Sequence, residues 1–551
     1  MARKSIKYIF VFGGVLSGLG KGIVASSLGF LLKSRGYNVT IHKLDPYLNI
    51  DPGTMNPYQH GEVFVLDDGS ETDLDLGHYE RFIDESLGRK NTTSAGRIYW
   101  DVLERERRGD YLGETIQVIP HITDEIKNRI KCVNEDDDYD IVITEVGGTV
   151  GDIEGQPFYE AIRQFILEEG KNNSFVIHTT LLPFISAAGE MKTKPTQHSV
   201  MRLREIGLEP NVLVCRTEQN HHLDNKLKRK LGLFCNVETT HVFESPDVET
   251  IYEIPLVLNQ QNFDQVIINS LGLRLENHEQ NLHILENHIG RFKHPKNTVN
   301  IAICGKYNNL HDAYKSILEA FIHAGIENEA HVEIKWVDTE KLEKSFDNSI
   351  FSEIDGILIP GGFGDRGIEG KIIASKYARE NDIPFFGICL GLQCAVIDIL
   401  RNICGLKDAN STEFKPNCKD PVIDLMIEQK NVETKGATMR LGSYPCTVKS
   451  GTKAFQAYGT IDIDERHRHR FEVNNKYRSL MEKNGLVISG ENRELNLVEM
   501  IEVKNHPWFV GVQFHPELKS RIVKSHPLFK DFVAAAILKK ENLLVEDTFQ
   551  E

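Results

Sequence analysis

The chain has 551 residues, of which 40% are hydrophobic and 26% are charged, and its formal net charge at pH 7 is −16. This length predicts two or more domains with substantial cores, and such ordinary globular composition argues against wholesale disorder. The negative charge argues against a general nucleic-acid or anionic-membrane binder, so local groups of Lys, Arg and backbone N–H must hold any anionic ligand.

The cysteines and the apolar segments bear on where the protein works. The nine cysteines are scattered, odd in number and without a C-x-x-C pair, which favours reduced thiols over a disulfide or zinc framework. A basic start before an apolar run resembles a signal peptide, but glycines interrupt the run and Lys21 ends it. No segment reaches the roughly 18 apolar residues of a membrane helix. We therefore expect a soluble, cytoplasmic protein.

A glycine-rich turn, GGVLSGLGKG at residues 13–22, follows the first apolar run and precedes a helical pattern at 23–33. Strand, glycine turn and helix form the context of a phosphate-binding loop, in which backbone N–H groups and Lys21 hold anionic oxygens. The match to G-x-x-x-x-G-K-[ST] is imperfect, because one glycine stands a residue early and Gly22 replaces the hydroxyl that helps to hold magnesium. The alternative is a plain turn between a strand and a helix.

Apolar strands and amphipathic helices alternate from this turn to about residue 270. Further strands are expected at 39–44, 141–144, 175–182 and 212–215. The alternation predicts a doubly wound α/β domain that binds ligands at the carboxyl ends of its strands.

Carboxylates at two places could supply the metal ligands that the loop lacks. Asp73 and Asp75 lie in the run ETDLDLGHYER, and Glu145 closes an apolar strand. A carboxylate at the end of a buried strand beside a phosphate loop suits magnesium. Taken singly, these residues could line a solvated face or cap a turn; together with the incomplete loop, they favour a metal site.

Two basic stretches are further anion-binding candidates. Residues 191–199 hold two lysines and three hydroxyls before an expected helix at 200–206, whose N-terminus would face a bound anion. That stretch could also be a capped loop. Lys226, Lys228, Arg229 and Lys230 form a second group, which is typical of a solvated helix face.

The chain changes character at residues 271–298, which are polar and rich in His and Asn, and a new strand is expected at 299–305. The sequence therefore predicts a first domain at 1–270, a linker at 271–298 and a second α/β domain at 299–551.

The chemistry of the second domain centres on PFFGICLGLQ at residues 384–393. An apolar strand that runs into Gly-x-Cys-x-Gly and a helix predicts a nucleophile elbow. We assign Cys389 as the nucleophile, His515 as its base and then acid, and Glu517 as the group that orients the imidazole. The N–H groups of Leu390 and of the glycine turn at 360–364 would form the oxyanion hole. Alone, the cysteine could be a structural thiol and the histidine a core residue.

With these motifs the second half resembles a class I glutamine amidotransferase domain. In that family a guanidinium recognises the carboxylate of glutamine and a carboxylate recognises its ammonium group. The resemblance implies a glutamine site formed by Gly362, Leu390, Gly391, Leu392, Gln393, Glu413 and Arg470.

The whole chain resembles the CTP synthase family, through GGVLSGLGKG, KLDPYLN, ETDLDLGHYERF, EVGGTVGDIE and KTKPTQ. The resemblance implies a P-loop NTPase-like synthetase (amidoligase) domain joined to a glutamine amidotransferase domain. It also implies that ATP phosphorylates O4 of the uracil ring of UTP and that ammonia from glutamine displaces the phosphate to give CTP.

The same resemblance assigns the nucleotide sites. ATP would contact Gly18, Leu19, Gly20, Lys21, Gly22 and Ile23, with Pro246, Asp247 and Val248 near the adenine. Asp75 and Glu145 would hold Mg²⁺, and Lys43 would meet the transferred phosphoryl group. The UTP triphosphate would contact Ser17, Lys192, Thr193, Lys194, Pro195, Thr196, Gln197 and Lys230, with Lys228 left open as an alternative to Lys230. Asp152, Ile153 and Glu154 would sense the cytosine end of the inhibitor CTP. Activation by GTP, a homotetramer and filaments are further expectations.

Two rival functions stay open from the sequence. One is another P-loop amidoligase with a glutaminase, such as the cobyrinic acid amidating type, which the triad and the KTKPTQ stretch argue against. The other is a non-catalytic filament or nucleotide-sensing protein that keeps the fold, for which nucleotide-dependent assembly without turnover is expected.

Overall fold

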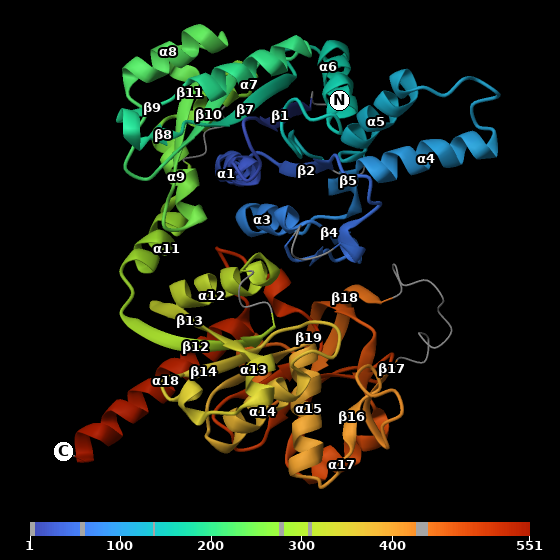
Figure 1. The fold of residues 1–551 in the computed structure, drawn as a ribbon, viewed down its shortest axis with the longest axis vertical. Coiled ribbons are helices and arrows are strands. Elements are labelled where there is room, and N and C mark those ends of the chain that lie inside the picture. The colour runs from blue at the N-terminus through green and yellow to red at the C-terminus, as the bar shows by residue number, and fades with distance from the viewer. Residues whose placement is uncertain are drawn as a thin grey trace. The chain divides into compact units, whose positions relative to one another are not determined.

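The computed structural model describes residues 6–55, 61–135, 138–274, 280–306, 311–425 and 439–550, with side chains up to residue 542. The chain packs into two compact units (Figure 1). Unit 1 consists of Met1–Pro52 and Asp75–Glu286, and unit 2 consists of Gly53–Leu74 and Asn287–Glu551. Among the helices in these described ranges, none is long and apolar enough to cross a membrane.

Unit 1 is built on a seven-stranded parallel sheet in the order β11-β10-β7-β1-β6-β2-β5. Chain order is broken at β1, which lies between β6 and β7, so the first βα turn opens at the topological switch point, where such sheets bind ligands. The strands are β1 Lys7–Gly13, β2 Val39–Asp45, β5 Thr92–Ser94, β6 Ile141–Val146, β7 Ser174–Leu181, β10 Val212–Thr217 and β11 Val242–Pro246. A small hairpin pairs β8 Phe184–Ile185 with β9 Glu190–Met191.

Helices cover both faces of this sheet (Figure 1). Phe10 and Phe12 of β1 pack with side chains of α4, α5 and α6 on one face. On the other face α1 lies against β2 and β6 with α9 and α10 beside it. The helices of unit 1 are α1 Lys21–Ser34, α3 Leu74–Ile83, α4 Ala95–Arg108, α5 Thr123–Cys132, α6 Gln156–Glu169, α7 Lys194–Glu205, α8 Asn225–Cys235, α9 Ile254–Gln260 and α10 Phe263–Ser270. A further helix, α11 His283–Lys293, begins in unit 1 and ends in unit 2.

Unit 2 has a nine-stranded sheet in the order β13-β12-β14-β15-β23-β22-β21-β18-β19. The first five strands are parallel and the last four are antiparallel, so one sheet joins a doubly wound half to a meander-like half. The strands are β12 Asn297–Gly305, β13 Ala330–Asp338, β14 Gly356–Ile359, β15 Phe385–Ile388, β18 Arg440–Val448, β19 Asp462–His469, β21 Leu486–Asn492, β22 Leu497–Val503 and β23 Phe509–Val512.

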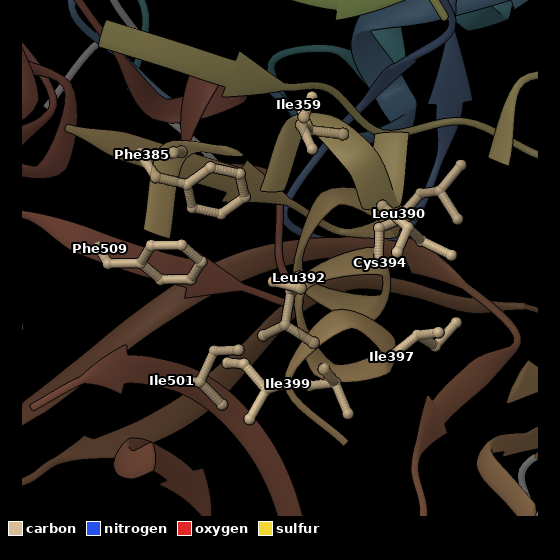
Figure 2. Packing of buried hydrophobic residues seen from close by; sticks show 14 of the residues in the cluster. Ile359, Phe385, Leu390, Leu392, Cys394, Ile397, Ile399, Ile501 and Phe509 are labelled. Atoms are coloured by element: carbon tan, nitrogen blue, oxygen red, sulfur yellow. The ribbon is translucent and has the colours of Figure 1, made fainter. Parts of the chain in front are cut away.

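The buried apolar residues of unit 2 form two large clusters, one of which lies between this sheet and α15. Leu392 and Ile399 of that helix lie beside Ile501 of β22, next to the stacked rings of Phe385 and Phe509 (Figure 2). The helices are α12 Lys315–Glu327, α13 Thr339–Lys344, α14 Ile368–Glu380, α15 Leu390–Asn402, α16 Lys453–Tyr458, α17 Arg478–Lys483 and α18 Pro527–Gln550. A small sheet joins β16 Ala409–Ser411, β17 Asp420–Leu425 and β20 Phe471–Val473.

Residues Gly53–Leu74 belong to unit 2 although unit 1 surrounds them in sequence. The segment carries β3 Phe64–Val65 and β4 Glu71–Thr72. Its acidic side chains bind groups of unit 2: Asp67 pairs with Arg466 at 2.6 Å, and Glu71 pairs with Arg468 at 2.8 Å. Because Arg466 is fully buried, it needs such a partner. The domain boundaries expected from the sequence remain a prediction. They divide the chain into contiguous domains and therefore do not include this insertion.

The expected elements agree with the structure to within a few residues, with one informative exception. The helix expected to begin at residue 200 is α7, which begins at Lys194. Pro195 occupies its first turn, where the missing N–H of proline has no intrahelical partner to lose. The stretch interpreted as a loop is therefore the helix N-terminus itself. The expected linker contains α11, and its residues 275–279 lie outside the described ranges.

Candidate active sites

The glycine turn of unit 1 connects β1 to α1 and leaves the helix N-terminus open. Gly18 has φ 73° and Gly20, the N-cap, has φ 87°, a left-handed conformation that favours glycine. The first N–H groups of a helix have no intrahelical partner and carry the positive end of its dipole. The local geometry is that of an anion-binding loop.

The loop packs against a buried pair of side chains, His178 and Ser199, whose contact no sequence motif revealed. A Cβ on Gly14 would lie 1.5 Å from Oγ of Ser199, so only glycine fits. That hydroxyl is 2.8 Å from Nε2 of His178. Burial, with a contribution from Lys21, lowers the pKa of His178 to about 3, so its ring is neutral.

Lys21 is nearly buried at the start of α1. Its Nζ donates a hydrogen bond of 2.6 Å to the carbonyl oxygen of Gly148. Burial lowers the pKa of Lys21, Glu145 opposes this shift and Lys43 adds to it. A lysine whose charge is costly in the free site gains most from an anionic ligand.

Lys43 lies at the centre of the charged cluster. Its Nζ is 2.9 Å from Oε1 of Glu145 and also donates to Asp75. Burial alone would lower the pKa of Lys43, but these two carboxylates outweigh it and hold the pKa well above its usual value. The hydroxyl of Tyr79 donates to the other oxygen of Glu145. The fixed ammonium therefore aligns both carboxylates beside the phosphate loop.

The same cluster explains why Gly22 replaces a hydroxyl residue. A Cβ at this position would lie 3.0 Å from Oδ1 of Asp75 and 3.1 Å from Oε2 of Glu145. The carboxylates thus occupy the space into which a serine or threonine side chain would project.

These carboxylates fit a magnesium ion that also binds nucleotide phosphates. Mg²⁺ prefers oxygen ligands and commonly takes one or two carboxylates together with phosphate oxygens. Asp75 directs Oδ1 towards the N-terminal turn of α1, next to the Gly22 position. Within the described ranges, no group of three or more His, Cys, Asp or Glu side chains forms a metal site.

Arg216 connects the loop to the residues expected near adenine. Its Nη1 donates to the carbonyl oxygen of Gly18 at 2.7 Å, and its Nε donates to Asp247 at 2.9 Å. Asp247 follows β11, whose last residue is Pro246. The structure therefore brings the loop and the 246–248 stretch together, through an arginine that carried no motif signal.

The N-terminal turn of α7 holds the second group of expected phosphate ligands. The hydroxyl of Thr196 accepts from Thr180 at 3.0 Å, and the amide of Gln197 donates to Thr193 at 3.0 Å. These internal bonds fix the turn and leave its free N–H groups to face an anion. Lys194 lies 5.8 Å from the ring centroid of Phe234 on α8, the helix that carries Lys230.

The remaining expected nucleotide contacts are on the surface of unit 1. Ser17, Lys230, Asp152, Ile153 and Glu154 are exposed. Asp152 accepts a hydrogen bond of 2.8 Å from the N–H of Thr149. Ile153 is 84% exposed, so its side chain is accessible to another molecule.

In unit 2, Cys389 has φ 51° and ψ −100° between β15 and α15. A non-glycine residue with positive φ is strained, and this strain marks a nucleophile elbow. The flanking glycines permit the turn: a Cβ on Gly391 would lie 2.2 Å from the carbonyl oxygen of Ile359, and one on Gly387 would lie 2.8 Å from the backbone of Gly391. The expected elbow is confirmed in its geometry.

His515 and Glu517 are paired as a base and its orienting group require. Nδ1 of His515 lies 2.7 Å from Oε1 of Glu517. Burial opposes charge on the imidazole, but Glu517 and the sulfur of Cys389 raise the pKa of His515 to about 10. A Cβ on Gly361 would lie 2.7 Å from Cε1 of His515 and 3.6 Å from Cβ of Cys389. The glycine turn therefore touches both reacting side chains.

A cavity of about 300 Å³ opens beside His515 and Glu517. The glycine turn, His515, Glu517 and Arg468 line it, together with Glu62 and Val63 of the inserted segment. A cavity of this size suits a small polar substrate.

The candidate glutamine ligands gather around the glycine turn. Glu413 accepts a hydrogen bond of 3.0 Å from the N–H of Gly364. Burial raises the pKa of Glu413, while that hydrogen bond and the cations Lys306, Lys371 and Arg470 oppose the rise. Glu413 thus feels the charge of Arg470, and a carboxylate with a guanidinium is a set of groups that suits an amino acid's ammonium and carboxylate.

Gln393 takes a role that the sequence did not suggest. Its amide nitrogen donates to the carbonyl oxygen of Phe471 at 3.0 Å and to Oε1 of Gln513 at 3.4 Å. The amide nitrogen of Gln513 in turn lies 3.7 Å from Sγ of Cys389. Only Oε1 of Gln393 is left for a substrate, and Gln513 is a neighbour of the nucleophile that motif reasoning missed.

Comparison with known proteins matches both units. Residues 7–273 match the family model for the CTP synthase N-terminus, and residues 309–535 match that for class I glutamine amidotransferases. A CTP synthase of Caldanaerobacter subterraneus is 57% identical over 536 residues, which are 97% of this chain and 99% of the relative. A CTP synthase of Clostridium kluyveri is 56% identical over 534 residues, with coverage of 97% and 99%.

Proposed function

The chain belongs to the CTP synthase family, and from that premise we propose how its residues aminate UTP. ATP transfers its terminal phosphoryl group to O4 of the uracil ring, and ammonia displaces that phosphate to give CTP. Glutamine hydrolysis in unit 2 supplies the ammonia. The reaction is an ATP-dependent, glutamine-hydrolysing ligase step of pyrimidine nucleotide biosynthesis.

This proposal is supported above all by the presence of two different candidate sites in one chain. Unit 2 holds a strained Cys389 and the His515–Glu517 pair next to the same residue, Gly361. Unit 1 aligns Lys43 with two carboxylates beside the glycine turn. A thiol triad without an activating site would only hydrolyse glutamine, and a phosphate loop without a nitrogen source would only transfer phosphate.

In unit 2 the thiolate of Cys389 attacks the carboxamide carbon of glutamine. His515, protonated in the resting pair, gives its proton to the departing ammonia, and a thioester remains. Water then attacks the thioester, His515 takes a proton from that water, and glutamate is released with the thiolate restored. N–H groups of Leu390 and of the glycine turn would stabilise the oxyanion, and Gly362, Gly391, Leu392, Glu413 and Arg470 would hold the substrate.

In unit 1 Lys21 and the N–H groups of residues 18–23 hold the ATP phosphates, and Lys43 meets the phosphoryl group in transfer. Asp75 and Glu145 would hold Mg²⁺, which neutralises charge on the phosphates when bound. We place adenine near residues 246–248, next to the Arg216 bridge. The UTP triphosphate is assigned to Ser17, the N-terminal turn of α7 and Lys230.

Regulation and assembly are proposals that rest on family membership. We expect GTP to activate, CTP to inhibit through residues 152–154, and the protein to form homotetramers that can stack into filaments. Nine free cysteines in the described ranges support a reducing, cytoplasmic compartment.

The test is CTP formation by purified protein with ATP, UTP and Mg²⁺, supplied with glutamine plus GTP or with ammonium. Wild type should use both nitrogen sources. Cys389→Ala should lose glutamine-dependent formation by at least about a thousandfold and retain ammonium-dependent formation. Loss of both would make Cys389 a structural residue.

The rivals give different outcomes in the same assay. If glutamine is hydrolysed but neither source yields CTP, the acceptor is wrong and another amidoligase is favoured. Nucleotide-dependent assembly without hydrolysis or turnover would favour a non-catalytic protein.

A further inference from the structure

Gln513 lies behind the catalytic cysteine in a position that the triad chemistry leaves unexplained. It is fully buried on the strand-end turn two residues before His515. Its side-chain nitrogen is 3.7 Å from Sγ of Cys389, within hydrogen-bond range for sulfur. The carbonyl oxygen of Arg468 is also 4.0 Å from that sulfur. A thiol can donate to this carbonyl, whereas a thiolate can only accept, and Gln513 is placed to supply its hydrogen.

The polarity of the Gln513 amide is set by a chain of hydrogen bonds. This series of hydrogen bonds starts at the carbonyl oxygen of Phe471, which can only accept. The group of Gln393 that faces this oxygen must therefore be its NH₂. The second hydrogen of that NH₂ points to Oε1 of Gln513. With its oxygen thus engaged, Gln513 turns its own NH₂ towards the sulfur.

The starting carbonyl is itself held in place by buried histidines. Nδ1 of His469 lies 3.2 Å from the oxygen of Phe471 and must donate to it. Nε2 of His469 then accepts from Nδ1 of His467 at 2.9 Å. Burial and the neighbouring Arg440 lower the pKa of both histidines well below the usual value. Both rings are therefore neutral, and the directions of their hydrogen bonds do not change near neutral pH.

We propose that Gln513 is a further catalytic residue of the glutaminase site, which stabilises the Cys389 thiolate by a hydrogen bond to sulfur, and that Gln393 is the positioning residue that aims it. The proposal rests on the glutaminase half of the proposed function. A donor fixed in a buried site is worth more than one in water, because it needs no reorganisation when charge develops on the sulfur. The same donor would be withdrawn if the amide turned over.

The test uses the full-length protein and two substitutions at one position. Gln513→Met keeps the length of the side chain but has no donor. Gln513→Glu keeps its shape but places a carboxylate beside the sulfur. Alkylation of Cys389 by iodoacetamide is followed from pH 5 to 10 by mass spectrometry of the peptide that contains it. Glutamine-dependent CTP formation is measured relative to ammonium-dependent formation in the same preparation.

We expect Gln513→Met to lose about tenfold in kcat with glutamine, as for one hydrogen bond to a charged group, and to move the pH midpoint of alkylation upwards. Gln513→Glu should lose more than Gln513→Met. A packing role predicts the opposite order, because Glu matches Gln in shape better than Met does. That opposite order, or an unchanged alkylation profile in both variants, would overturn the proposal.

The test includes substitutions at a second position, Gln393, and at a control position, Ser489. Gln393→Met leaves Gln513 in place but removes the hydrogen bond that orients its amide. A smaller upward shift of the pH midpoint of alkylation is therefore expected. This variant replaces the Gln513 variants in the test if those do not fold. Ser489→Ala removes a buried hydroxyl of β21 that has no hydrogen-bond partner among the described residues, and should leave the profile unchanged. If wild type makes no CTP, the proposed acceptor fails, while the alkylation profile still decides the role of Gln513.

Discussion

The phosphate loop of unit 1 and the nucleophile elbow of unit 2 are both turns between a parallel strand and a helix, but they use glycine for different reasons. In the loop, Gly22 is small because carboxylates lie 3.0 and 3.1 Å from where its Cβ would be. In the elbow, Gly387 and Gly391 are small because backbone atoms approach them. In the loop, glycine leaves room for carboxylate oxygens. In the elbow, glycine lets backbone segments approach one another closely, so that Cys389 can take a strained conformation.

The two sites also differ in how they hold charge. In unit 1 a buried ammonium, Lys43, is balanced by Asp75 and Glu145, so the site is a preorganised set of full charges. In unit 2 the imidazole of His515 binds Glu517, and both Glu517 and Cys389 raise its pKa, so its charge depends on both. The first site should therefore fail when one charge is removed, and the second should respond to pH.

The largest effect in unit 1 is expected from Glu145→Gln. The neutral amide cannot balance the buried Lys43 and is a poorer magnesium ligand, so CTP formation should fall at least about a hundredfold with either nitrogen source. Glutamate release from glutamine should persist and checks that unit 2 is folded. Full CTP formation in this variant would remove Glu145 from the site.

Gly22→Ser tests the steric account of the loop. Serine restores the usual motif, yet its Cβ would press on Asp75 and Glu145. We expect CTP formation to fall about tenfold, mainly through a higher KM for ATP. Gly290→Ala on α11 is the matched control, because a Cβ there would meet nothing within 4 Å. An increase in activity in Gly22→Ser would show that the hydroxyl is simply missing.

Arg216→Gln should have a milder effect. The variant loses the guanidinium that joins the carbonyl of Gly18 to Asp247, so the loop is less well ordered before ATP binds. A rise of about three- to tenfold in KM for ATP, with kcat little changed, is expected. A fall in kcat at constant KM would instead place Arg216 in phosphoryl transfer.

A pH dependence of stability is also expected in unit 2. Because the folded-state pKa of His515 is raised to about 10 from the ordinary 6.5, its contribution to stability is complete below about pH 6.5 and is lost as pH rises towards 10. Thermal unfolding of wild type and His515→Gln is compared between pH 6 and 9.5. The stability difference between them should shrink as pH rises; a growing difference would contradict the Glu517 pairing.

Both sites could be found from sequence because each depends on a local pattern. The turn at 13–22 and the elbow at 384–393 carry their glycines, lysine and cysteine in one short stretch, next to strands that apolar runs reveal. His515 and Glu517 were found for the same reason, two residues apart after a strand. The pairing of Glu145 with the loop could be inferred because the carboxyl ends of parallel strands meet at one edge.

The residues that were missed act across the fold and carry no local pattern. His178 of β7 lies beneath the loop, where it contacts Ser199, and Arg216 reaches the loop from β10. Gln513 contacts the sulfur of Cys389 directly, in an orientation set by the hydrogen bonds of Gln393. The start of α7 was placed late because its first turn is polar and contains a proline, which resembles a loop.

The sequence by itself thus determined the fold class and the two reactions and proposed the motif residues, since these follow from short-range periodicity and from residue types at fixed spacing. Only the tertiary structure decided that residues 53–74 pack with unit 2, that carboxylates exclude a side chain at Gly22, and that Gln513 turns its amide nitrogen to Cys389. These are matters of space and of hydrogen-bond direction between distant segments, and they are fixed only when strands and helices have packed together.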